Sequence, residues 1–290
     1  MKQRLSLFFI LLFVPLFNFS EAKVLEQDES NHSLSAAKLQ KQKVDAETNI
    51  KIISFNVLAN RSTWSERSNG IIDKIRDLNP DIAGLQETMS TQRRDISNAL
   101  TDEYQLVEFD IPVTYGNPIL LKKDRFDILG SGFVDAAECG NTRYITWLLL
   151  RDKSSNKEFH FYNNHFCVRS SSNSSQAEHV IELAELIEQH QTTSSSGTTA
   201  IVVGDFNATR NRTIMRYLLD EGTITGQLSP VQLVDTWEVV YPNMSKPSTT
   251  ERDAAIDWIL TIPEETIIDA SVDDSEGFSD HHPVTATFQF

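Results

Sequence analysis

Beyond residue 48, short apolar runs rich in β-branched residues alternate with longer stretches whose apolar positions recur every three or four residues. Runs of the first kind are typical of strands, and spacing of the second kind is typical of amphipathic helices. The runs predict strands over Ile50–Val57, Ile82–Gln86, Tyr104–Phe109, Ile119–Lys122, Phe126–Phe133, Arg143–Leu150, Glu158–Asn164, Ala200–Val203, Ile256–Ile262 and Val284–Phe290. The helical spacing predicts helices over Glu66–Leu78, Thr91–Leu100, Gln176–Gln189 and Ile214–Leu219.

The order of these elements predicts the architecture. The first strands are separated by helices, whereas the strands between residues 104 and 164 follow one another closely, as in antiparallel hairpins. Connections of both kinds predict an α/β (α+β) domain in which two mixed sheets pack together with helices outside. No linker-like change of composition follows residue 49, so we expect one domain over residues 49–290.

The first 48 residues have a different character. A basic start (Met1–Arg4), an apolar run (Leu5–Phe17) and small residues near Ala22 predict a cleavable signal peptide over residues 1–22. The apolar run is too short to cross a bilayer, so we expect no stable membrane anchor. Residues 23–48 are polar and lack clear periodicity, so they are predicted to form an arm or linker. We therefore expect a secreted or periplasmic protein.

Composition narrows the class of protein. The chain of 290 residues is 40% hydrophobic and 23% charged, which excludes a fully disordered, collagen-like or coiled-coil protein. Its formal net charge of -15 argues against a broad basic face for polyanions, although a local site can still hold a phosphate. We expect a monomer.

The chain has two cysteines, Cys139 and Cys167. In an oxidising compartment they can form a lasting disulfide. The strand Arg143–Leu150 and the strand after it are joined by the polar turn Asp152–Lys157, and such a hairpin would bring the two cysteines near each other. We therefore expect a bridge, with two buried free thiols as the alternative.

Several apolar strands end abruptly in polar side chains. These side chains are Asn56, Glu87, His165, Asp205 with Asn207, and Asp280 with His281. In sheet enzymes the loops beyond the strand ends form the site, so these groups are predicted to meet there. The three acids suit Mg²⁺, or the larger Mn²⁺ or Ca²⁺, and without a Cys–His cluster zinc is less natural. Each residue alone also has an ordinary structural explanation, such as a turn cap or a helix start.

Taken together, these residues resemble the endonuclease/exonuclease/phosphatase superfamily of metal-dependent phosphoesterases. The resemblance covers about Lys51 to Pro283 and rests on six blocks in the family order. The blocks are Ile53–Val57, Pro80–Thr88, Tyr162–Phe166, Val202–Ala208, Ala255–Leu260 and Ser279–Pro283. The resemblance implies a four-layer α/β/β/α sandwich, which agrees with the predicted order of strands and helices.

For binding, the resemblance implies that Glu87 is the principal ligand of Mg²⁺, or of Mn²⁺ or Ca²⁺, with help from Asn56 and Asp280. It further implies that Arg143 contacts the substrate phosphate and that Asn117 positions a loop of the site. An ordinary solvent-exposed arginine is the alternative for Arg143, and Pro118 departs from the family block around Asn117.

For catalysis, the resemblance implies that Asp205 orients or deprotonates the attacking water and that Asn207 contacts the phosphate or the nucleophile. His165 and His281 are implied to flank the phosphate, and Asp257 to orient His281 and keep it cationic. Which histidine or acid acts as the general base stays open.

These roles predict a secreted phosphoesterase that attacks phosphorus in line with an activated water. A nuclease-type phosphodiesterase is the first expectation, and nucleic acid is then the substrate. Its basic contacts would come from Arg61, Arg67, Arg93, Arg143, Arg169, Arg210 and Arg212. A phospholipid phosphodiesterase, with Trp64 and Phe278 dipping into the membrane, and an inositol- or sugar-phosphate phosphatase are alternatives. An inactive secreted binding protein is the alternative of another class.

Overall fold

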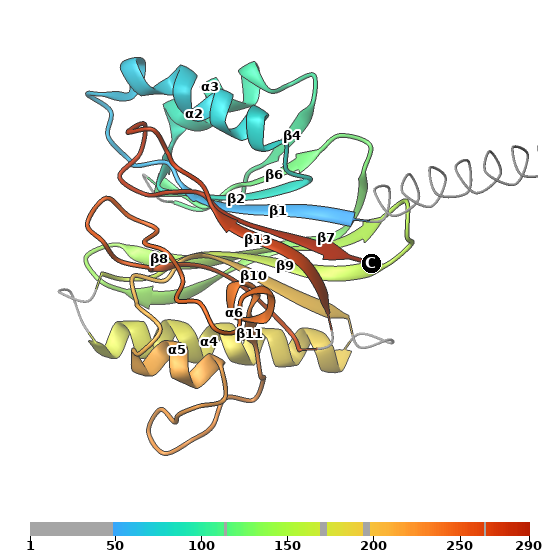
Figure 1. Cartoon of the computed structure of the whole chain (residues 1–290), viewed down its shortest axis with the longest axis vertical. Coiled ribbons are helices and arrows are strands. Elements are labelled where there is room, and N and C mark those ends of the chain that lie inside the picture. The colour runs from blue at the N-terminus through green and yellow to red at the C-terminus, as the bar shows by residue number, and fades with distance from the viewer. Residues whose placement is uncertain (1–48, 113–114, 169–172, 194–197, 264) are drawn as a thin grey trace, which may run out of the picture. The chain divides into compact units, whose positions relative to one another are not determined.

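The computed structural model describes residues 49–112, 115–168, 173–193, 198–263 and 265–290. The predicted signal peptide and arm, residues 1–48, lie outside the described residues. Two six-stranded sheets and five helices account for most of the described chain between residues 49 and 290. The two sheets lie face to face with helices on both outer sides, as Figure 1 shows. The predicted four-layer arrangement of two mixed sheets is thus confirmed.

The first sheet carries the N-terminal strands and the end of the chain. Its strand order is β13-β14-β1-β2-β6-β4. The strands are β1 (Asn49–Asn56), β2 (Ile82–Gln86), β4 (Tyr104–Val107), β6 (Ile119–Lys122), β13 (Thr266–Val272) and β14 (Val284–Gln289). Only the β1–β2 pair in this sheet is parallel, and it aligns Asn56 with Gln86, the residue before Glu87. The ends of β1 and β2 therefore deliver Asn56 and Glu87 to one edge.

The second sheet carries the middle of the chain. Its strand order is β11-β12-β10-β9-β8-β7. The strands are β7 (Phe126–Glu138), β8 (Thr142–Asp152), β9 (Glu158–His165), β10 (Thr199–Asp205), β11 (Val234–Asp235) and β12 (Asp257–Thr261). A separate short pair, β3 (Thr88–Met89) with β5 (Tyr115–Gly116), follows directly on the end of β2.

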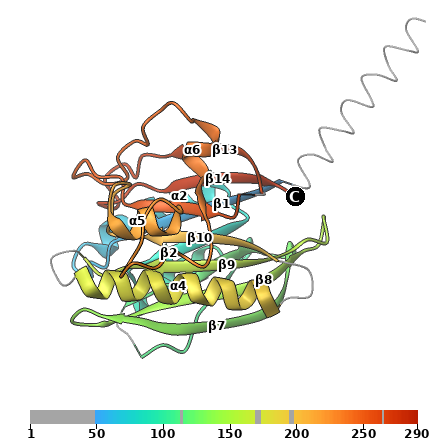
Figure 2. The ribbon, with the colours of Figure 1, turned by 90° about the horizontal axis from the view of Figure 1, so that it is seen from below.

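The helices cover the outer faces because each has one apolar side. Helices α2 (Trp64–Leu78) and α3 (Ser90–Ala99) bury Ile71 and Ile96 against the first sheet. Helices α4 (Asn173–Thr193) and α5 (Thr213–Leu218) pack against the second sheet, and Figure 2 shows α4 lying roughly along its strands. The short helix α6 (Thr236–Val240) follows β11. No helix in the described part of the chain is long and apolar enough to span a membrane.

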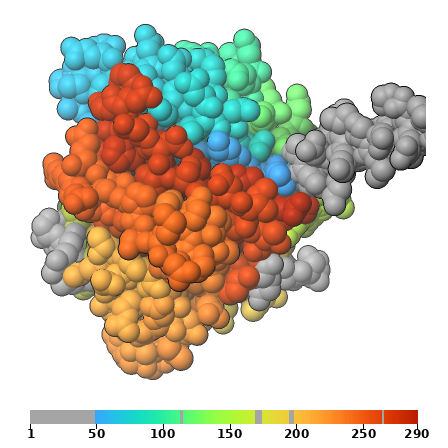
Figure 3. Space-filling model, viewed as in Figure 1, coloured from blue at the N-terminus to red at the C-terminus, as the bar shows by residue number. Residues whose placement is uncertain are grey.

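The core between the sheets is mostly apolar, although the amides of Gln86 and Asn163 are buried there and hydrogen-bond to each other. Side chains such as Ile50, Leu121, Phe161 and Val203 are fully or almost fully buried there. Burying such side chains contributes about 1.5–3 kcal/mol each, which makes this layer the main support of the strand ends. The C-terminal third of the chain, orange to red in Figure 3, forms a continuous surface from the α2 side of the domain to the α5 side. The C-terminal third contributes strands to both sheets, β11 and β12 to the second and β13 and β14 to the first.

Two departures from the predicted elements have physical reasons. Strand β13 was not predicted, because it is an edge strand whose side chains are mostly partly exposed or exposed, so the sequence lacks an apolar run there. Strand β7 continues beyond Phe133 to Glu138 with alternating exposure, also as an edge strand. The disulfide prediction is confirmed, because Cys139 and Cys167 are bonded with their Cα atoms 6.0 Å apart.

Candidate active site

Three acidic or imidazole side chains share one level of the second sheet. The parallel register of β9 and β10 places His165 beside Asp205, and the antiparallel register of β10 and β12 places Asp205 beside Asp257. The glycine before Asp205 permits this close approach, since Gly204 has a φ of +152° and a Cβ there would lie 2.2 Å from the backbone oxygen of Asn164. The strand pairing itself therefore assembles this part of the site.

Asn56 joins the two sheets across the site. Its amide nitrogen donates to Asp205 Oδ2 at 3.1 Å and lies 3.2 Å from Glu87 Oε1. Its amide oxygen accepts from the backbone N–H of Leu58. Glu87 takes a left-handed backbone conformation with φ of 58° and also accepts from the backbone N–H of Ala59. The carboxylates of Glu87 and Asp205 are therefore held facing each other through one amide.

His281 forms a buried ion pair with Asp257. Its Nδ1 lies 2.9 and 3.1 Å from the two carboxylate oxygens, and the hydroxyl of Thr249 donates to the same carboxylate at 2.6 Å. Burial disfavours the charged imidazole, but Asp257, Asp205 and Asp280 outweigh it and raise the pKa of His281 to about 10. His281 is therefore cationic, with Nε2 turned to Asp205 Oδ2 at 3.7 Å.

His165 has the opposite protonation state. Burial, together with the charges of Arg143 and His281, lowers the pKa of His165 to about 4, although Asp205 opposes this. Arg143 Nη1 lies 3.1 Å from His165 Nδ1. Since a guanidinium has only donors, Nδ1 of the neutral ring accepts and Nε2 carries the hydrogen. That N–H group is 3.5 Å from Asp205 Oδ2 and 3.7 Å from Glu87 Oε1.

Asp205 lies at the centre of these contacts. Burial and the neighbouring charge of Asp257 raise the pKa of Asp205, while His281, His165 and the backbone N–H of Asn207 act in the other direction. The N–H of Asn207 donates to Asp205 Oδ1 at 2.8 Å, which is an Asx-turn. Asp205 is therefore both a turn residue and a member of the site.

These side chains line one open cavity of about 330 Å³. The lining residues are Glu87, Arg143, His165, Val168, Asp205, Asn207, Thr250, Arg252, Ala254, Ile256, Asp280 and His281. Two buried polar atoms at the cavity, Asp280 Oδ1 and Arg143 Nε, have no hydrogen-bond partner within the described part of the chain. Buried polar groups are nearly always paired, so both atoms are suited to pair with a bound ion, water or ligand group.

The donors in this cavity suit a hard cation. Glu87, His165 and Asp205 offer ligand atoms within 4.8 Å of one another, as do Asp205, Asp257 and His281. A metal ligand must be unprotonated, which rules out the cationic His281, and His165 carries its hydrogen on the nitrogen that faces the carboxylates. Carboxylate and amide oxygens remain, which are the ligands that Mg²⁺, Mn²⁺ and Ca²⁺ prefer.

The sequence of the whole region carries a family signature. Residues 53–281 match the model of the endonuclease/exonuclease/phosphatase family. The chain belongs to this family. Its members hydrolyse phosphoester bonds and depend on divalent metal ions, so the protein is a metal-dependent phosphoester hydrolase.

Solved structures of this family share the fold. A family member from Bacteroides vulgatus is 22% identical with a TM-score of 0.69, over 84% of this chain and 99% of the other. The Bacteroides thetaiotaomicron mannosyl-6-phosphatase is 21% identical with a TM-score of 0.67, over 83% and 100% of the two chains. The human Nocturnin catalytic domain with bound sulfate is 20% identical with a TM-score of 0.70, over 84% and 94%. A search of curated protein sequences found no match.

Two predicted site residues in this family enzyme have backbone partners. Asn117 does not line the described cavity. Its amide donates to the carbonyl of Tyr144 at 3.2 Å, which fixes β8 one residue beyond Arg143. Asn207 lines the cavity, while its side-chain amide donates to the carbonyl of Phe166 at 3.0 Å. Their functional roles stay predictions.

Several basic residues suggested from the sequence are engaged elsewhere. Arg67 is buried and donates to the carbonyls of Val57, Leu58 and Phe278. Arg93 pairs with Glu108, and Arg210 pairs with Glu221 and Glu238. Each of these three guanidinium groups is already engaged within the fold, their contacts with nucleic acid stay predictions, and Arg169 lies outside the described residues.

Sequence reasoning also missed residues of the cavity and its surroundings. Arg252 and Thr250 line it from the loop before β12, where an isolated bridge pairs Thr250 with His281. Thr249 supports Asp257 from the same loop. These residues follow no strand end or motif, so only the folded loop shows their place.

Proposed function

We propose that this enzyme is a secreted phosphodiesterase of nuclease type that attacks phosphorus in line with an activated water. One observation carries the proposal. Two facing carboxylates, one neutral and one cationic imidazole and a partly unpaired guanidinium meet in a single open cavity. This combination supplies a cation site, hydrogen-bond donors for an anionic phosphate and a buried carboxylate that can accept a proton.

A divalent cation fits the acidic side of the cavity. Glu87 and Asp280 would hold it through carboxylate oxygens, and the buried Oδ1 of Asp280 is already without a partner in the described chain. Asn56 would contribute its amide oxygen after its amide turns over, because its nitrogen faces Glu87 and its oxygen accepts from the N–H of Leu58. When bound, such a cation polarises a non-bridging oxygen and offsets charge on the leaving oxygen. Mg²⁺ is our first choice, with Mn²⁺ or Ca²⁺ as alternatives.

The other side of the cavity binds the phosphate. Arg143 offers its unpaired Nε–H, and a guanidinium fork suits phosphate oxygens. The cationic His281 and the N–H of neutral His165 add two more donors on either side of Asp205. These fixed donors stabilise the charge that accumulates on the phosphate oxygens as the water attacks.

Asp205 is our candidate for the general base. Asn56 and the backbone of Asn207 fix its two oxygens, and its raised pKa makes it a better proton acceptor than an ordinary carboxylate. His165 is a poorer candidate, because its Nδ1 already accepts from Arg143. The proton of the attacking water would pass to Asp205 Oδ2, while the cationic His281 would remain a donor to the phosphate.

Secretion is part of the proposal and has its own support. The disulfide between Cys139 and Cys167 suits an oxidising compartment, and the sequence of residues 1–22 has the pattern of a signal peptide. We expect protein recovered from the medium of a secreting host to begin at Lys23. An extracellular protein that retains Met1 would contradict cleavage of the signal peptide, and retention of the chain inside the cells would contradict export.

A phosphomonoesterase is the second candidate, favoured by the mannosyl-6-phosphatase among the similar structures. The phospholipid alternative loses support, because Trp64 is buried and its indole N–H donates to Asp95. The inactive binding protein also loses support, because every predicted metal and catalytic residue is present and clustered.

Activity assays decide between these readings. The purified protein is incubated with Mg²⁺, Mn²⁺ or Ca²⁺ and with single-stranded DNA, RNA, duplex DNA, sphingomyelin, inositol phosphates or a hexose phosphate. We expect cleavage of nucleic acid that stops in EDTA and returns when the cation is restored. Faster hydrolysis of a phosphomonoester than of any diester would replace the diesterase proposal, and undiminished activity in EDTA would overturn the cation site.

A further inference from the structure

A second cavity lies against the first. It has a volume of about 290 Å³, and Arg143 lines both cavities. Its described lining is Pro112, Tyr115, Glu138, Gly140, Asn141, Thr142 and Arg143. A substrate phosphate held by Arg143 in the first cavity therefore has room for one substituent in the second.

Both walls of the second cavity are tied to residues of the first. On one side, Tyr115 pairs with Met89 in the β3–β5 ladder, which follows directly on Glu87. Arg93 donates to Glu108 and to the carbonyl of Thr88, which fixes this ladder. The pairing of β3 with β5 thus sets how far Tyr115 lies from Glu87.

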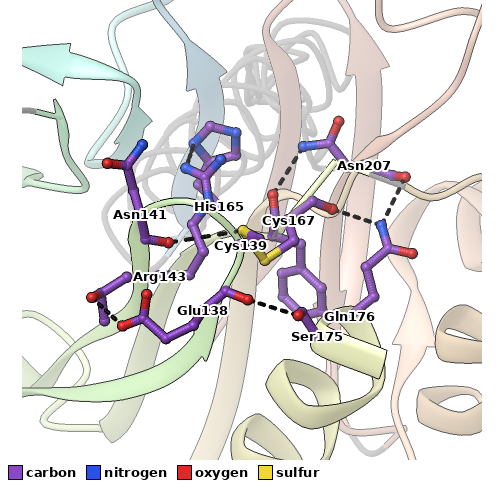
Figure 4. The surroundings of a disulfide bond; sticks show 11 residues. Glu138, Cys139, Asn141, Arg143, His165, Cys167, Ser175, Gln176 and Asn207 are labelled. Atoms are coloured by element: carbon purple, nitrogen blue, oxygen red, sulfur yellow. Dashed lines mark hydrogen bonds between the residues drawn. A yellow bond between two sulfur atoms is a disulfide. The ribbon is translucent and has the colours of Figure 1, made fainter. Parts of the chain in front are cut away.

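On the other side, the disulfide holds the turn that carries Asn141. Cys139 begins this turn, and its partner Cys167 lies two residues beyond His165, as Figure 4 shows. Within the turn Gly140 has a φ of +90°, a conformation that favours glycine, and the N–H of Cys139 donates to the carbonyl of Asn141. The turn is thus covalently fixed relative to the catalytic histidine.

The lining of the second cavity has a definite chemistry. Tyr115 is 42% exposed, and Asn141, which is also exposed, lines the same cavity. Among the described lining residues Arg143 is the single cation, and the carboxylate of Glu138 is engaged by the hydroxyl of Thr142. An exposed aromatic side chain and an exposed amide that line one cavity suit a flat ring with hydrogen-bonding edges, and nothing in this described lining favours a second phosphate.

We propose that this second cavity, between Tyr115 and Asn141, binds one nucleobase of the substrate, unstacked from its neighbours, while its phosphate lies between Arg143 and His165. The inference rests on the proposed phosphodiesterase function and specifies its substrate class. Stacking on an aromatic side chain requires a base that is free of its own stack, so single-stranded nucleic acid and short oligonucleotides are favoured over duplex. Tyr115 is then a specificity residue that leaves the reacting atoms untouched.

The test uses dithymidine monophosphate and two analogues in which either the 5′ or the 3′ base is removed. We expect Tyr115→Ala to raise KM for the complete dinucleotide by about 5- to 100-fold, the range expected for one stacked base, with little change in kcat. Tyr115→Phe keeps the ring and should restore KM. For the analogue that lacks the bound base, wild type and Tyr115→Ala should have equal KM, and inhibition by inorganic phosphate should be unchanged.

Failure of this inference is distinguishable from failure of the function. If dinucleotides are hydrolysed and neither abasic analogue differs from the parent, or Tyr115→Ala matches wild type, the base site is wrong and the diesterase stands. If no diester is hydrolysed, calorimetric titration with thymidine monophosphate decides. Binding that Tyr115→Ala weakens supports the base site without the diesterase. Absence of binding, or a Tyr115-dependent preference for a hexose phosphate, overturns the base site.

Discussion

The amide nitrogen of Asn56 lies 3.1 Å from the carboxylate of Asp205, although the two residues belong to different sheets and are 149 positions apart in the chain. Asn56 ends β1 and Asp205 ends β10, so this hydrogen bond joins the carboxyl ends of two strands across the sandwich. The same amide also donates to Glu87. Asn56 therefore connects Glu87, the proposed cation ligand, with Asp205, the proposed proton acceptor.

Replacing Asn56 should therefore affect stability and activity together. Asn56→Ala removes a donor from a buried carboxylate, and leaving such a group unpaired costs roughly 1–3 kcal/mol. We expect the free energy of unfolding in urea to fall by that amount and kcat to fall by about 10²-fold. Asn98→Ala on the exposed side of α3 is the control. A variant with wild-type kcat would show that the bridge does not orient Asp205.

Glu87→Gln should separate cation binding from folding. The substitution keeps the shape of the side chain and one of its two acceptor oxygens but removes a charge from the proposed cation site, so we expect lower affinity for the metal and lower activity. Activity is measured across a Mn²⁺ or Mg²⁺ titration. Glu66→Gln, an exposed residue at the start of α2, is the matched control. Equal metal dependence of the two variants would remove Glu87 from the cation site.

His281 and Asp257 should act as a unit. His281→Ala removes a cationic donor, and Asp257→Asn removes the charge that keeps this imidazole protonated, so each should lower kcat by roughly 10²-fold or more. Because the residues act through each other, the double variant should be little worse than either single one. The measurement is kcat of the three variants, with circular dichroism to verify folding. Multiplicative losses would mean that the two side chains work independently.

The part of the site that could be predicted from the sequence consists of residues at strand ends. An apolar run that stops at a polar residue marks where a strand leaves the core, so Asn56, Glu87, His165 and Asp205 could be identified from the sequence. Their meeting depends on the register of β9 and β10, which no local pattern encodes. The parallel pairing of these strands becomes visible only in the fold.

Arg67 and Arg252 show what the sequence alone could not predict. Arginine is a residue type that often contacts nucleic acid at a protein surface. The guanidinium of Arg67, however, is buried among carbonyls that only the folded loops bring together. Arg252 lies on a loop without periodicity, and its place at the cavity follows from the bridge between Thr250 and His281. The positions of both arginines depend on how distant loops pack together, which residue type does not reveal.

The disulfide should matter for stability and for the site. It closes a loop with a sequence separation of 28, for which chain entropy predicts a stabilisation of about 3–4 kcal/mol. We expect the Cys139→Ser/Cys167→Ser variant to lose up to that free energy of unfolding in urea. At a temperature where it remains folded, KM should rise because the turn with Asn141 is released. An unchanged KM in the folded double variant would show that the turn holds its position without the bridge.

A buried histidine should make the fold sensitive to acid. Burial, with a contribution from the charge of His190, lowers the pKa of His160 to about 4; the two rings stack 4.5 Å apart, and the His160 ring also contacts Thr198 and Tyr162. The unfolded chain binds this proton below about pH 6.5 and the folded chain only below about 4. More protons are then bound in the unfolded state, so stability falls as pH drops through that window.

The variant His160→Gln isolates this contribution. A shift of this size corresponds to at most about 3 kcal/mol. Urea unfolding at pH 7 and pH 5 should therefore show a smaller loss of stability on acidification for His160→Gln than for wild type. The remaining loss would come from other groups, such as His165 and His179, whose pKa values burial also lowers. His282→Gln, on the partly exposed His282, is the control, and equal pH dependence in His160→Gln and wild type would contradict a neutral, buried His160.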